Sequence, residues 1–89
     1  MAWRIEYAES TQKDLRRLDP QERKRIRSFL EEKVAGLEDL RSLGKPLAGG
    51  LSGFWRYRVG DYRIITSLED EKLRVLVVRV AHRKDVYRN

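Results

Sequence analysis

The segment that decides the fold is Phe54-Trp55-Arg56-Tyr57-Arg58-Val59-Gly60-Asp61-Tyr62-Arg63-Ile64. Apolar residues and arginines alternate on both sides of Gly60-Asp61, which is the period-two pattern of two strands that each bury one face. Because glycine reaches positive φ at little cost, Gly60-Asp61 is predicted to form a two-residue hairpin turn. This loop length pairs Val59 with Tyr62 and places Arg58 opposite Arg63.

The same register brings three guanidinium groups to one face of the hairpin. Arg56, Arg58 and Arg63 share that face, and the aromatic and aliphatic residues between them point to the other, where helices are expected to pack. Like charges directly opposite each other destabilise a sheet by up to about 1 kcal/mol, so an anion is needed to favour them. Guanidinium donors match phosphate oxygens in a bidentate geometry. We interpret this face as an anion site; the alternative is a solvated face whose arginines splay into water. Three apolar residues are expected on it as well: Ile65, Leu76 and Val78.

Upstream of the hairpin, the sequence predicts one strand and two helices. Trp3 to Tyr7 alternates as a strand, and Thr11 with Asp14 is expected to cap a short first helix. Asp19-Pro20 is the start signal of a second helix, since proline at the first helical position loses no hydrogen bond. Apolar residues recur along that helix at three- and four-residue spacing: Ile26, Phe29, Leu30, Val34 and Leu37. The Gly- and Pro-rich stretch 44–53 is expected to be a loop.

Downstream of the hairpin, residues 62–68 and 73–80 complete the predicted sheet. The last run is apolar and β-branched apart from Arg74 and Arg79, as in an interior strand covered on both faces. The predicted order is β-α-α-β-β-β, a small α+β fold with an antiparallel sheet and two helices packed on one face. Residues 1–89 are expected to form one domain. Continuing the last strand brings His82 and Arg83 to the end of the sheet near the arginines.

The composition narrows the classes of function. Twenty Lys and Arg against 14 Asp and Glu give a net charge of +6 and a pI near 10.0. This basic balance favours a polyanionic partner; the alternative is that it serves solubility alone. With no cysteine and one histidine, neither a metal site nor a cofactor is expected. The mean hydropathy is −0.69, and the first residues lack the apolar segment of a secretory leader. We therefore expect a cytoplasmic protein with no membrane association.

Three segments of the chain resemble the RelE/ParE superfamily of toxins from toxin–antitoxin modules, and more closely its RelE branch. They are the hairpin segment quoted above and the closing Val80-Ala81-His82-Arg83-Lys84-Asp85-Val86-Tyr87, together with Lys45-Pro46-Leu47 before the Gly-rich loop. The resemblance implies the RelE-like fold and a metal-independent mRNA endoribonuclease. Such an enzyme enters the ribosomal A site and activates a ribose 2′-hydroxyl against the adjacent phosphate, leaving a 2′,3′-cyclic phosphate. A cognate RelB-like antitoxin and a toxin that is monomeric within the hetero-oligomer are also implied.

The resemblance assigns catalytic roles to the hairpin arginines and to two residues near the C-terminus. Arg56, Arg58 and Arg63 are implied to hold the scissile region, Arg83 to assist the leaving group, and Tyr87 to stack on or orient the nucleotide. We expect Lys45 and Lys84 to contact RNA together with Arg56 and Arg58.

The chain departs from the best-known RelE pattern, which has lysines on this strand where Arg56 and Arg58 stand here. A guanidinium stays protonated at physiological pH, so neither arginine serves as the general base. His82 is favoured for that role because an unperturbed imidazole has a pKa of about 6.5. The alternatives are Tyr87 as a phenolate and a base contributed by the ribosome.

Two other functions remain open on the same scaffold. A ParE-like poison of DNA gyrase binds protein and needs no catalytic group, and a catalytically inactive nucleic-acid-binding relative needs only the net charge and the arginines. The arginines together with His82, Arg83 and Tyr87 favour the ribonuclease.

Overall fold

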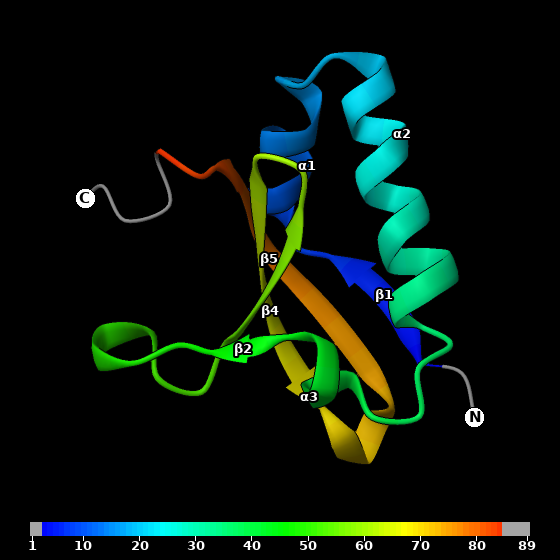
Figure 1. The fold of residues 1–89 in the computed structure, drawn as a ribbon, viewed down its shortest axis with the longest axis vertical. Coiled ribbons are helices and arrows are strands. Elements are labelled where there is room, and N and C mark those ends of the chain that lie inside the picture. The colour runs from blue at the N-terminus through cyan, green and yellow to red at the C-terminus, as the bar shows by residue number, and fades with distance from the viewer. Residues whose placement is uncertain (1–2, 85–89) are drawn as a thin grey trace.

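A computed structural model describes residues 3–84, so Tyr87 lies outside the described residues. A five-stranded sheet has the strand order β1-β5-β4-β3-β2 (Figure 1). The strands are β1 (Arg4–Tyr7), β2 (Lys45–Pro46), β3 (Trp55–Val59), β4 (Tyr62–Glu69) and β5 (Arg74–His82). The helices are α1 (Glu9–Arg16), α2 (Pro20–Ser28), its π-helical continuation (Phe29–Val34) and α3 (Leu40–Leu43), with 3-10 turns at Gly49–Leu51 and Asp70–Lys72. No helix within residues 3–84 is both long and apolar enough to cross a membrane.

The β3–β4 hairpin forms in the predicted register. Val59 pairs with Tyr62, and Arg58 pairs with Arg63. Gly60 has a φ of 58°, and a Cβ added there would lie 3.0 Å from Nη1 of Arg25 on α2. Because this backbone angle favours glycine, the turn fixes the register that unites the arginines.

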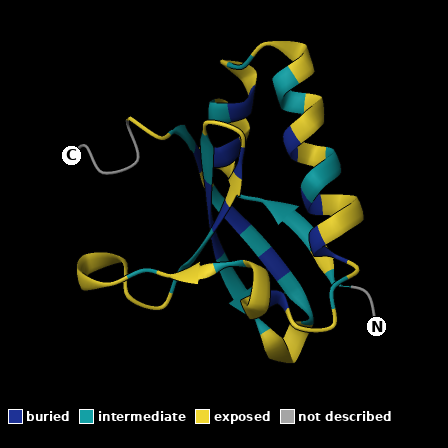
Figure 2. Cartoon of the chain, in the orientation of Figure 1, coloured by how far each residue is buried: buried dark blue, intermediate teal, exposed yellow. Residues whose placement is uncertain are grey.

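The core lies on one face of the sheet, between the strands and the helices. Figure 2 shows buried positions alternating with less buried ones along the central strands, and a buried stripe along α2. Ile26, Leu30 and Val34 have no exposed surface, which confirms the predicted helical stripe. Burying each aliphatic side chain of this kind contributes about 1.5–3 kcal/mol. The cluster consists of Leu15, Ile26, Leu30, Val34, Leu40, Tyr57, Val59, Ile64, Val75, Val77 and Val80. The predicted α+β class with helices on one face is confirmed.

Strand β1 differs from the prediction of a wholly antiparallel sheet, because it pairs in parallel with β5. Its four residues reach only from Arg74 to Val77 of β5. Beyond Val77, the outer edge of β5 is met by side chains of α1 instead of a strand.

The predicted helix cap at Thr11 and Asp14 is wrong. Helix α1 begins at Glu9, with Ala8 as its N-cap residue. The Thr11 hydroxyl donates to the carbonyl oxygen of Val77, and Oδ2 of Asp14 accepts the amide of Val80 at 2.9 Å. A buried strand edge without partners costs about 1–3 kcal/mol per polar group, so these side chains stabilise β5 rather than the end of their own helix.

The second helix begins at Pro20 with Asp19 as the N-cap residue, as predicted, although the Asp19 side chain makes no capping hydrogen bond. The stretch 44–53 is more ordered than a plain loop. Within it, β2 pairs Lys45 with Arg56 and Pro46 with Trp55, and residues 47–53 then project away from the sheet (Figure 1).

A β-bulge in β5 decides which side chains reach which face. Ile65 pairs with Arg79 and Thr66 pairs with Val77, so Val78 is an extra residue opposite a single step of β4. Regular alternation would place Val78 and His82 on the same face as Arg63, and the extra residue reverses every position that follows it. Arg79 therefore lies on that face, and Val78, which was predicted to share it, is the residue of the bulge that has no partner on β4.

The prediction that the last strand is covered on both faces is also wrong. Val75, Val77 and Val80 are buried under the helices, whereas the Arg79 side chain on the other face is 60% exposed. Leu76, which precedes the bulge, pairs with Ser67 and keeps its predicted side.

Candidate nucleic-acid interface

Five cations gather on the face of the sheet opposite the core, and we call this surface the arginine face. Arg58 opposes Arg63 in one row of the register. In the next row, Lys45 of β2 opposes Arg56 of β3, and the row continues through β4 to Arg79 of β5. Neighbouring strands are about 4.8 Å apart, so this second row is about 14 Å long. The structure thus brings together the three predicted arginines, the predicted Lys45 and one further arginine.

Ile65 forms an apolar floor between the cations. It is only 4% exposed, yet it is not part of the core cluster beneath the helices. Its register partners are Arg56 on one side and Arg79 on the other. Directly opposed side chains have Cβ atoms about 5 Å apart, so the aliphatic stems of both arginines are placed to cover Ile65.

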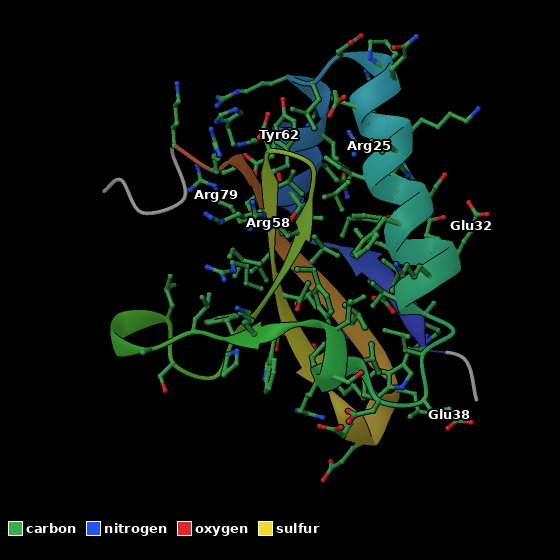
Figure 3. The ribbon with its side chains drawn as sticks, viewed as in Figure 1. Arg25, Glu32, Glu38, Arg58, Tyr62 and Arg79 are labelled. Carbon is green, nitrogen blue, oxygen red and sulfur yellow. The ribbon has the colours of Figure 1, made fainter. Side chains whose placement is uncertain are left out.

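Arg79 is the member of the arginine face that sequence reasoning missed. In the sequence, Arg79 only interrupts the apolar run of residues 73–80. Its Nε lies 3.5 Å from Oδ2 of Asp14, a carboxylate that is 12% exposed and also accepts the amide of Val80. In Figure 3, Arg79 lies on the opposite side of the hairpin from α2, whereas Arg25 belongs to α2. No sequence signal marks the bulge that turns Arg79 to this side.

His82 does not join the arginine face. It pairs with Tyr62, whose ring packs against the core, and the two rings meet edge to face with centroids 5.6 Å apart. Its Nδ1 accepts the amide of Lys84 at 3.3 Å. Nδ1 is thus already engaged by a backbone donor. The bulge separates the favoured base from the arginines.

Arg83 lies at the tip of the β3–β4 hairpin. Its amide donates to the carbonyl oxygen of Asp61 at 2.7 Å, and its Nε is 3.8 Å from the Asp61 carboxylate. These contacts tie the end of β5 to the hairpin turn, close to the row that contains Arg58 and Arg63. Lys84 follows in an exposed turn.

The chain matches the family model described as the ParE toxin of the type II toxin-antitoxin system, parDE, over residues 5–87. It belongs to this family. Toxin RelG of Mycobacterium tuberculosis is 35% identical over 91 residues, which cover 99% of each chain. Toxin RelE of the same organism is 36% identical over 78 residues, covering 85% of this chain and 76% of the relative.

Solved structures show the same relationship. The toxin of the RelBE2 toxin–antitoxin complex of M. tuberculosis superposes with a TM-score of 0.85 at 29% identity, covering 96% of this chain and 95% of that one. A RelB–RelE complex from Methanococcus jannaschii gives a TM-score of 0.67 at 29% identity, covering 92% and 94%. The isolated Escherichia coli RelE toxin, at 22% identity over 91% of this chain and 84% of its own, has a TM-score of 0.69 and shows the fold alone. The chain is a type II toxin of the RelE/ParE superfamily, on its RelE-like branch, as the sequence resemblance predicted.

Proposed function

We propose that this RelE-like toxin is a metal-independent endoribonuclease that cleaves mRNA in the ribosomal A site. The observation that carries the proposal is the β3–β4 register, which holds Arg58 opposite Arg63, with Arg56 beside them on the face opposite the core. In the absence of a ligand these like charges repel each other, and a bound phosphate diester turns the same arrangement into a favourable one.

The proposed reaction is a transesterification. The 2′-oxygen attacks the adjacent phosphorus, its proton passes to a base, the bond to the 5′-oxygen breaks, and that oxygen takes up a proton. The products are a 2′,3′-cyclic phosphate and a 5′-hydroxyl. Arg56, Arg58 and Arg63 act on the negative charge that develops at phosphorus, where each preorganised donor is worth about a hundredfold to a thousandfold in rate. Arg83 assists the leaving group, and Tyr87 orients the nucleotide.

The proton acceptor has to be a group other than the arginines. The four arginines of this face offer no neutral base, because guanidinium does not lose its proton. His82, Tyr87 and a ribosomal group remain the three sources. His82 would first have to leave the Lys84 amide and turn away from Tyr62.

We also propose a RelB-like antitoxin as the partner that neutralises the toxin, because the M. tuberculosis and M. jannaschii relatives were solved as RelB–RelE complexes. The neutralised toxin is then a monomer within a toxin–antitoxin hetero-oligomer. The free toxin acts in the cytoplasm, where the ribosome is. The half-buried Leu76 and the cations of the arginine face fit an acidic segment that also carries apolar side chains.

The test is a translation extract to which purified protein is added, with mRNA ends mapped by primer extension. We expect cuts in phase with codons from the wild type and none from a variant that combines Arg56→Gln, Arg58→Gln and Arg63→Gln. The match to the ParE family model makes gyrase inhibition the second candidate, so supercoiling by DNA gyrase is followed in parallel. Intact mRNA with loss of supercoiling would reject the ribonuclease.

A further inference from the structure

We propose that Arg79 is an additional contact for the backbone of single-stranded RNA, and that Asp14 on α1 is the residue that positions it. The inference rests on the proposed function, since it needs RNA on the arginine face. It adds a binding residue on β5 to the residues of the β3–β4 hairpin.

The bulge at Val78 is held in place by α1. Ser10 Oγ donates to the carbonyl oxygen of Val78 at 2.8 Å, and Thr11 Oγ1 donates to the neighbouring carbonyl of Val77. On the other side of the bulge, Asp14 accepts the amide of Val80. Three polar side chains of one helix, those of Ser10, Thr11 and Asp14, thus hydrogen-bond to the backbone of β5 on both sides of the bulge. Bulges often redirect a side chain toward a site, and here the redirected side chain is Arg79.

The ion pair with Asp14 leaves the phosphate-binding end of Arg79 directed outward. Asp14 approaches Nε, and the two terminal amino groups carry the other four N–H donors of a guanidinium. The Arg79 side chain is 60% exposed, whereas the Asp14 side chain is 12% exposed. The largely buried carboxylate therefore holds Nε, and the rest of the guanidinium faces solvent. A planar guanidinium fixed at one edge and open at the other suits bidentate binding of phosphate oxygens.

The spacing of the row favours a chain of phosphates over a single anion. Arg56 and Arg79 are two strands apart, or about 10 Å, and Lys45 extends the row by another strand. One phosphate reaches only neighbouring members of such a row, whereas an extended nucleic-acid backbone reaches all of them. Ile65 lies between Arg56 and Arg79 in this row.

The test is an Arg79→Gln variant titrated with a fluorescent single-stranded RNA whose 2′-hydroxyls are methylated, so that it binds without being cut. We expect affinity to fall about three- to tenfold, and the slope of log affinity against log salt to become shallower by about 0.7, the value of one phosphate contact. Arg4→Gln is the matched control, because Arg4 is 67% exposed and also pairs with a carboxylate. Its register partner, Arg74, is about 16 Å along β5 from Arg79, and we expect no change in slope.

The outcomes separate this inference from the proposed function. If the wild type binds and cleaves RNA while Arg79→Gln keeps its affinity and slope, the inference fails and the proposed function stands. If the wild type neither binds this RNA nor cleaves mRNA, both fail.

A double-mutant cycle tests the positioning role of Asp14. Asp14→Asn keeps an oxygen that accepts the Val80 amide but removes the charge that holds Arg79. We expect it to lower kcat/KM for mRNA cleavage about threefold in the wild type, and to have no further effect in the Arg79→Gln background. An equal loss in both backgrounds would show that Asp14 serves the fold alone.

Discussion

Replacing Arg58 with glutamine should raise stability and abolish most of the activity, an unusual combination that follows from the hairpin register. Arg58 is exposed and directly opposes Arg63, so Arg58→Gln removes no buried surface and relieves a repulsion. Two unit charges about 8 Å apart in the dielectric of water repel each other by about 0.5 kcal/mol, which is the size expected for this pair. For a domain of this size, 0.5 kcal/mol raises Tm by about 2–4 °C. The loss of one donor to the phosphorane should slow cleavage about a hundredfold to a thousandfold.

The assay combines thermal unfolding at two salt concentrations with primer extension in a translation extract. Near 1 M salt the screening length is about 3 Å, so the gain in Tm should disappear there. Arg4→Gln is the control: it loses an ion pair with Glu6 at 3.6 Å and should gain no stability and lose no activity. Cleavage by Arg58→Gln at the wild-type rate would refute the reasoning. A loss of stability above about 1 kcal/mol would also refute it, since Arg58 would then have a structural role.

Three further predictions concern other parts of the molecule. Burial raises the pKa of Tyr57 to about 12. Because the pKa of a free tyrosine is about 10, the stability gained from the neutral Tyr57 is complete below pH 10 and is lost as pH rises to 12. In alkaline denaturation this loss should be about 2–3 kcal/mol, and Tyr57→Phe should lack it. Gly44→Ala should lower the free energy of unfolding by about 1–3 kcal/mol, because its Cβ would lie 3.0 Å from the buried Tyr57 ring; Gly50→Ala, which meets nothing within 4 Å, should change it by less than about 0.5 kcal/mol in the same denaturant titration. Removal of a general base slows a reaction about a hundredfold or more. His82→Gln should slow cleavage much less than this, and a loss of that size in a single-turnover assay would restore His82 to that role.

The local part of the fold could be predicted from the sequence, because the signals and the structures they form are close together in the chain. Gly60-Asp61 defines a turn between two alternating strands, and that turn alone fixes Arg58 opposite Arg63. The stripe of Ile26, Leu30 and Val34 similarly follows from helical periodicity within one element.

The misplaced side chains at the end of β5 have one physical origin, which is the bulge at Val78. It is stabilised by Ser10 and Thr11, which lie 68 and 66 residues from their acceptors along the chain, so no local pattern reveals it. Because strand side chains alternate, one extra residue moves His82 away from the arginines and moves Arg79 toward them. The capping prediction for Thr11 and Asp14 also failed because of contacts distant in the chain: these polar side chains hydrogen-bond to the edge of β5.

The central claim is that RNA binds the arginine face, and the most direct measurement is NMR of the arginine Nε–Hε groups during titration with the methylated single-stranded RNA. We expect the largest shifts at Arg56, Arg58 and Arg63, with smaller ones on α2. Shifts confined to Arg23, Arg25 and Arg27 on α2, with the hairpin arginines unchanged, would contradict the claim.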